Sequence, residues 1–113
     1  MIDVRLYVLQ RLSALVMLPF VAGHLAVMIY AIRGGLTAEE ILGRTQGSIG
    51  WFAFYGLFTL AVAVHGSIGL RAVLREWTSL AGRRLDGTTG LVLALLAVLG
   101  LRASWAVTFG VVS

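Results

Sequence analysis

The chain has 113 residues, of which 59% are apolar and 12% are charged, and its mean hydropathy is +0.95. A water-soluble domain of this size has too much surface for its interior to enclose so many apolar residues. The chain contains no Cys, which excludes disulfides, Cys-ligated zinc sites and protein-ligated iron–sulfur clusters. The net charge of +4 comes from Arg residues scattered over short hydrophilic segments, without the basic stripe and interleaved aromatics typical of nucleic-acid binding. We therefore predict an integral membrane protein with no nucleic-acid partner.

Three stretches are long and apolar enough to cross a bilayer as helices, which takes about 20 mostly apolar residues. They run from about 12 to 32, from about 50 to 70 and from about 88 to 112, and Arg102 interrupts the third. The first stretch exceeds the apolar segment of a signal peptide and no small-residue cleavage site closes it, so we expect a retained helix. The predicted fold is an all-α integral membrane protein, with three transmembrane helices in one membrane-anchor domain over residues 1–113.

Two connections join the predicted helices. Gly34-Gly35 is expected to stop the first helix, and Thr37 to cap a short amphipathic helix that Gly43 and Gly47 then break. The second connection, residues 78–87, is polar and rich in Arg, so it offers a surface on which another subunit can dock.

The Arg residues beside the spans predict the orientation of the chain. The first connection contains two of them, together with Glu39 and Glu40. The N-terminal tail and the second connection contain six: Arg5, Arg11, Arg71, Arg75, Arg83 and Arg84. We therefore expect a multi-pass protein of a bacterial-type inner (plasma) membrane, with the N-terminus in the cytoplasm and the C-terminus outside.

Both histidines lie within predicted spans, where ionisable side chains are costly and mark functional sites. His65 shares a helix face with Gly69, one turn later, and Gly66 lies close by. Small residues leave room for another helix or for a planar group such as a haem macrocycle, for which a neutral imidazole is an axial ligand. From these residues alone, haem ligation and simple helix packing both remain open for His65.

The two histidines are expected at different depths. His24 follows Arg11 by 13 residues, which puts it roughly 20 Å from the cytoplasmic side at the helical rise per residue. His65 precedes Arg71 by 6 residues, hence roughly 9 Å from the same side. We therefore do not expect them to share one iron, and each needs a partner histidine from elsewhere.

Two motifs point to a known family. Gln10-Arg11-Leu12-Ser13 with His24 in the first span, and His65-x-x-x-Gly69-x-Arg71 closing the second, resemble the cytochrome b membrane anchor of succinate dehydrogenase and fumarate reductase (respiratory Complex II). The resemblance implies an electron-transfer subunit without a catalytic residue of its own. It would hold a flavoprotein subunit and an iron–sulfur subunit on the lipid membrane and pass electrons to or from quinone.

The resemblance also implies cofactors and ligands. Family members with two haems take one ligand from each of four helices, and this chain is similar to half of that helical bundle. His24 would then ligate the distal haem b and His65 the proximal one, and a second membrane-anchor subunit would supply the other two ligands. Two haems per complex are favoured, and a single haem bound through His65 is the alternative.

Four further residues belong to the expected site, and the resemblance assigns Arg11 and Ser13 to it. Arg71 would pair with a haem propionate, and Gly69 would leave room on the His65 face. Arg11 and Ser13 would lie close to the quinone or to a propionate.

Arg102 has two possible roles. It lies about 14 residues into the third span, roughly 20 Å deep, so it either pairs with a propionate of the distal haem or extends its guanidinium towards the outer interface. Two other functions compete with the cytochrome for the whole chain. One is a non-haem structural anchor or assembly subunit, and the other is a small transporter subunit in which His24 and His65 relay protons.

Overall fold

The structure, a computed structural model, describes residues 4–110, without the side chains of Ala38 and Ile41. Its elements in chain order are α1 (Val4–Gly34), α2 (Ala38–Thr45), α3 (Ile49–Trp77) and α4 (Gly82–Thr108). The three long helices are each apolar and long enough to cross a membrane. The predicted all-α fold with three transmembrane helices is therefore confirmed.

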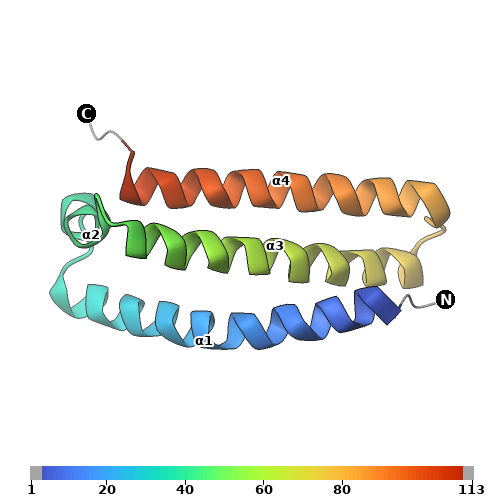
Figure 1. Ribbon diagram of the computed structural model, residues 1–113, viewed down its shortest axis with the longest axis horizontal. Coiled ribbons are helices and arrows are strands. Elements are labelled where there is room, and N and C mark those ends of the chain that lie inside the picture. The colour runs from blue at the N-terminus through green and yellow to red at the C-terminus, as the bar shows by residue number, and fades with distance from the viewer. Residues whose placement is uncertain (1–3, 111–113) are drawn as a thin grey trace.

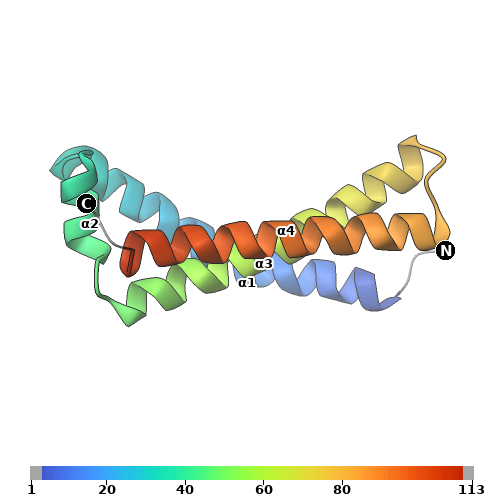
Figure 2. The same cartoon turned by 90° about the horizontal axis from the view of Figure 1, so that it is seen from above.

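The central helix of the bundle is α3, which packs against α1 on one side and α4 on the other (Figure 1). Figure 2 shows that α1 and α3 cross and diverge towards both ends, while the short α2 lies across one end of the bundle. The start of α1 and the α3–α4 connection lie at the opposite end from α2 and the end of α4 (Figure 1). This arrangement is that of a chain crossing a membrane three times.

The helices extend beyond the predicted spans because hydropathy marks the part that fits the hydrocarbon, not the point where a helix ends. Thus α1 begins at Val4 rather than near 12, and α3 continues to Trp77 rather than to 70. The second connection is shorter than predicted, since α4 begins at Gly82 and Arg83 and Arg84 lie in its first turn. Positions 111–112 of the expected third span lie outside the described residues.

The turn between α1 and α2 follows the prediction except at one glycine. α1 ends at Gly34, and Gly35 has a φ of +124°, a conformation that favours glycine. Thr37 caps α2, and its Oγ1 accepts a hydrogen bond of 3.2 Å from the backbone N–H of Glu40. Gly43 does not break the helix as predicted, because α2 continues to Thr45.

Pro19 lies inside α1 without ending it. Proline has no backbone N–H, so the carbonyl four residues earlier loses its helical donor, and the helix bends there rather than stops. Figure 1 shows α1 bowed along its length.

Small residues bring α3 and α4 close together. A Cβ added to Gly100 would lie 2.5 Å from Cβ of Thr59, so the two backbones approach closely at this level. The same interface buries Ala63, Ser67 and Ser104, which are at most 2% exposed. Membrane helices pack in this way because lipid tails leave van der Waals contact as the main attraction between them.

Polar contacts hold both ends of α4 against the rest of the chain. At one end Thr45 Oγ1 donates to the carbonyl of Val107 over 2.6 Å, which fixes α2 against the end of α4. At the other end the guanidinium of Arg71 forms an ion pair with Asp86 of α4. The helices α3 and α4 therefore form one packed pair, and α1 packs against α3.

Candidate functional site

His65 contacts the first helix through its ring nitrogen. Its Nδ1 lies 3.3 Å from Oγ of Ser13, a residue of α1 that is 7% exposed. The Ser13 hydroxyl also lies 2.9 Å from the backbone carbonyl of Gln10, one turn earlier. The pair joins α1 to α3, and sequence analysis missed it because it depends on how the two helices cross.

The two glycines near His65 face different neighbours. A Cβ on Gly69 would meet Nε2 of Gln10 at 3.6 Å, whereas a Cβ on Gly66 would meet Leu96 of α4 at 3.9 Å. Gly69 therefore lies towards α1, on the His65 side of α3, but Gly66 lies towards α4. The flat face expected beside His65 consequently contains Gly69 and not Gly66.

A cavity of about 290 Å³, lined by both apolar and charged residues, opens near this contact, where the start of α1 diverges from the end of α3. Arg11 lies beside it on α1, and its guanidinium donates to the Tyr7 hydroxyl over 3.0 Å. Oε1 of Gln10 is buried and has no hydrogen-bond partner among the described residues. The cavity is lined by Leu6, Tyr7, Gln10, Ile68, Arg71, Ala72, Arg75 and Glu76.

Arg71, expected to pair with a propionate, has a protein partner in the structure. Its guanidinium bonds the carboxylate of Asp86, and the Arg71 side chain is 21% exposed. Asp86 lies in the second turn of α4, and sequence analysis did not identify it as a partner. Propionate binding by Arg71 stays a prediction.

His24 lies against aromatic residues of α3. Its ring packs edge-on against Phe58 and Tyr55, with centroid separations of 5.5 and 6.5 Å. The adjacent Gly23 permits this approach, because a Cβ there would lie 3.1 Å from Cε2 of Phe54. The glycine beside His24 therefore serves close helix packing.

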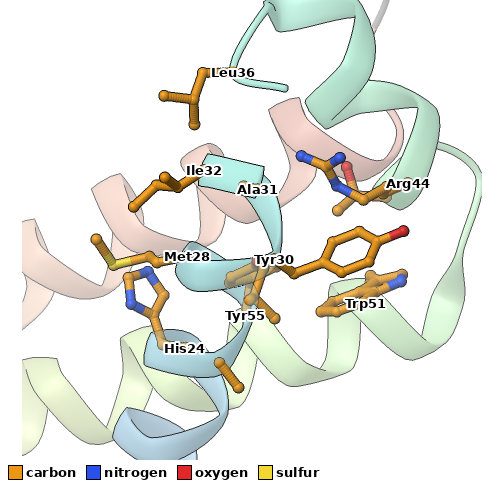
Figure 3. A pocket seen from close by; sticks show the side chains of 12 residues that line it. His24, Met28, Tyr30, Ala31, Ile32, Leu36, Arg44, Trp51 and Tyr55 are labelled. Carbon is orange, nitrogen blue, oxygen red and sulfur yellow. The ribbon is translucent and has the colours of Figure 1, made fainter. Parts of the chain in front are cut away.

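A second cavity, of about 700 Å³, begins at His24 and extends towards the α2 end of the bundle. Figure 3 shows its lining, with residues from α1, α2 and α3 around it. Arg44 of α2 is its cationic residue: its Nη2 lies 3.3 Å from the carbonyl of Gly35, and its guanidinium lies over the ring of Tyr30. Sequence analysis treated Arg44 only as a charge in a connection, since nothing in the sequence shows that α2 folds back over α1.

Arg102 lies elsewhere. It is exposed on α4, whereas the residues that line the His24 cavity come from the chain between His24 and Tyr55. The structure therefore brings Arg44, rather than Arg102, to this cavity.

The contacts place the two imidazoles at different heights. His24 of α1 lies level with Phe58 of α3, whereas His65 of α3 lies level with Ser13 of α1, so the two heights can be compared along α3. The seven residues from Phe58 to His65 correspond to roughly 10 Å along α3. Two nitrogens bound to one metal ion lie only about 4 Å apart, so these rings are too distant to share one. Among the described residues no three His, Cys, Asp or Glu side chains gather into a metal cluster.

Comparison with known proteins identifies the family. The family model described as "Succinate dehydrogenase/Fumarate reductase transmembrane subunit" matches residues 2–103, which include both histidines. No curated protein and no solved structure matches the chain. The family resemblance that the motifs predict is thus confirmed. The chain is a multi-pass membrane protein and belongs to the family of succinate dehydrogenase/fumarate reductase transmembrane subunits.

Proposed function

We propose that this chain is the cytochrome b anchor of a succinate:quinone oxidoreductase, in which it binds haem b and helps to form the quinone site. The proposal depends on one observation above all. In a chain of this family, both membrane histidines lie where α1 packs against α3, at different heights. His24 lines the cavity of about 700 Å³, whereas His65 contacts Ser13, one turn from Gln10 in the lining of the cavity of about 290 Å³. Each is therefore available to a different haem.

The residues present fit haem. At His65, Nδ1 faces the Ser13 hydroxyl, and Nε2 remains as the ligand atom. At His24, the imidazole lines an apolar cavity whose one cation among the described lining residues, Arg44, suits a propionate carboxylate. When bound, haem supplies one-electron transfer between the iron–sulfur subunit and quinone. Two haems per complex follow from two separate histidines, and the opposite ligands would come from a second membrane-anchor subunit.

The quinone would bind near the cavity at the start of α1. The guanidinium of Arg11 and the Tyr7 hydroxyl it contacts are hydrogen-bond donors that suit a quinone carbonyl oxygen. The unpartnered Oε1 of Gln10 accepts hydrogen bonds and suits a hydroxyl of the reduced quinol. These groups orient the head group, and Arg11 favours oxygen atoms that gain negative charge on reduction.

The orientation follows from the Arg distribution. The end of the bundle that contains the start of α1 and the α3–α4 connection has the majority of the flanking Arg residues, so it faces the cytoplasm of a bacterial-type inner membrane. The iron–sulfur subunit and the flavoprotein subunit would dock on that side. The cavity near Arg11 lies at the same end, which keeps the proposed quinone site close to the electron donor.

The test is a reduced-minus-oxidised absorption spectrum of the chain purified in mild detergent with the subunits that accompany it. The proposal predicts a b-type α-band, two haems per complex by pyridine haemochrome, and flavoprotein and iron–sulfur subunits in the preparation. A complete complex without an α-band would indicate a non-haem anchor and contradict the proposal. One haem per complex would contradict the role of His24 and leave the role of His65 in place.

A further inference from the structure

The Ser13 hydroxyl has two neighbours that together determine which nitrogen of His65 has the proton. Oγ lies 2.9 Å from the backbone carbonyl oxygen of Gln10 and 3.3 Å from Nδ1 of His65. A serine hydroxyl has a single hydrogen, and a carbonyl oxygen only accepts. With this hydrogen donated to Gln10 over the shorter of the two contacts, the lone pairs of Oγ face the imidazole. Nδ1 must then supply the hydrogen of the second bond.

We infer that Ser13 is a positioning residue that holds the neutral His65 ring in its Nδ1–H form and leaves the Nε2 lone pair for iron. The inference rests on the proposed function, in which His65 ligates a haem. Histidines that bind metals usually donate their other N–H to an acceptor, which orients the ring and makes the ligand nitrogen more basic. Here the acceptor comes from another helix, so the packing of α1 on α3 sets the ring orientation.

Burial strengthens this assignment. Ser13 is 7% exposed, so water does not readily replace its oxygen as the acceptor. The Gln10 carbonyl that takes the hydroxyl hydrogen belongs to the preceding turn of the same helix, and this fixes the direction of the hydroxyl. The motif comparison leads us to expect Ser13 close to the quinone or to a propionate, and in the structure its hydroxyl faces the imidazole and a backbone carbonyl.

The experiment compares Ser13→Ala, Ser13→Thr and Ser104→Ala in the complex purified with its partner subunits. Ser13→Ala removes the acceptor, so we expect about 10- to 100-fold weaker binding of the haem at His65, measured by haem transfer to apomyoglobin. The midpoint potential of the same haem should rise, because a less basic imidazole stabilises oxidised iron less. Ser13→Thr keeps the hydroxyl and should restore both values.

Ser104→Ala is the matched control. Ser104 is also buried, at 2% exposed, and its hydroxyl bonds the carbonyl of Gly100 one turn earlier in α4. It should leave haem affinity and potential at wild-type values. If Ser13→Ala behaves like this control while His65→Ala removes a haem, the positioning role is wrong and haem ligation stands. If the wild-type complex contains no haem, both the ligation and the positioning role fail.

A second measurement needs no variant. The reduced-minus-oxidised infrared difference spectrum of the wild-type complex, labelled with ¹⁵N-histidine, contains imidazole ring modes that report hydrogen bonding at Nδ1–H. A hydrogen-bonded Nδ1–H on the ligand whose modes vanish in His65→Ala supports the inference. A free Nδ1–H on that ligand overturns it.

Discussion

The guanidinium of Arg44 lies over the ring of Tyr30, with Cζ 5.2 Å from the ring centroid, at the edge of the cavity that begins at His24. Arg44 belongs to the short α2, which lies across the end of the bundle, and Tyr30 belongs to α1. The contact holds a cation beside the proposed distal haem site. In this proposal α2 positions Arg44 at the cavity in addition to covering the end of the bundle.

Replacing Arg44 should therefore alter the distal haem. In Arg44→Gln the positive charge that favours the reduced, less positive iron is lost, so the midpoint potential of the haem at His24 should fall. Arg102→Gln is the control, since Arg102 is exposed on α4 away from this cavity. Redox titration of both variants measures the two potentials, and a fall in potential only in Arg102→Gln would contradict the role of Arg44 and support the propionate alternative for Arg102.

Glycine-to-alanine substitutions should lower stability where two helices approach closely and should have little effect at open positions. Gly100→Ala should destabilise most, because its new methyl would meet the Cβ of Thr59 at 2.5 Å, where little can move. Gly23→Ala should cost less, within the about 1–3 kcal/mol typical of overpacking, because the edge of the Phe54 ring can shift. Gly90→Ala is the control, since a Cβ there meets no atom within 4 Å. Thermal unfolding in detergent measures all three, and equal stabilities would contradict the packing described for α3.

The Arg71–Asp86 ion pair should contribute little to stability. The Asp86 side chain is 66% exposed, and exposed pairs are worth about 0–1 kcal/mol. We expect Asp86→Asn to lower the unfolding midpoint slightly and to leave the haem content unchanged. If Arg71 also binds a propionate, Arg71→Gln should weaken haem retention, whereas Asp86→Asn should not. Equal haem retention in the two variants would restrict Arg71 to the ion pair.

The quinone proposal is tested by Arg11→Ala. Loss of a charged hydrogen-bond donor costs about 1.5–3 kcal/mol, so quinone reduction should fall about 10- to 100-fold. Succinate-dependent reduction of a dye that takes electrons directly from the flavoprotein should stay unchanged. Arg33→Ala alters the last turn of the same helix at the opposite end of the bundle and serves as the control. Equal quinone activity in Arg11→Ala and Arg33→Ala would exclude a quinone role for Arg11.

Sequence analysis predicted the features that depend on local composition. The three spans follow from apolar length alone, and the end of α1 at Gly34 and the Thr37 cap follow from the conformational preferences of single residues. Gly43 was misjudged because one helical glycine costs only about 1 kcal/mol, which the contacts of α2 overcome.

The contacts between helices were not predictable from the sequence. Each long helix is apolar on every side, so its pattern does not specify which face meets a neighbour. The Ser13–His65 contact joins residues 52 positions apart, and the Arg71–Asp86 pair joins the consecutive helices α3 and α4, so both depend on how the helices pack. The motifs named His65, Ser13 and Arg71 as site residues but gave no information on their partners.

The central claim is that His65 and His24 each ligate a separate haem, and single substitutions test it most directly. His65→Ala and His24→Ala complexes are purified with their partner subunits, and haem is counted by pyridine haemochrome against the wild type. We predict that each variant loses one haem and keeps the other, and that the midpoint potential of the remaining haem differs between the two variants. Full haem content in either variant, in a complex with all of its subunits, would contradict the assignment of that histidine.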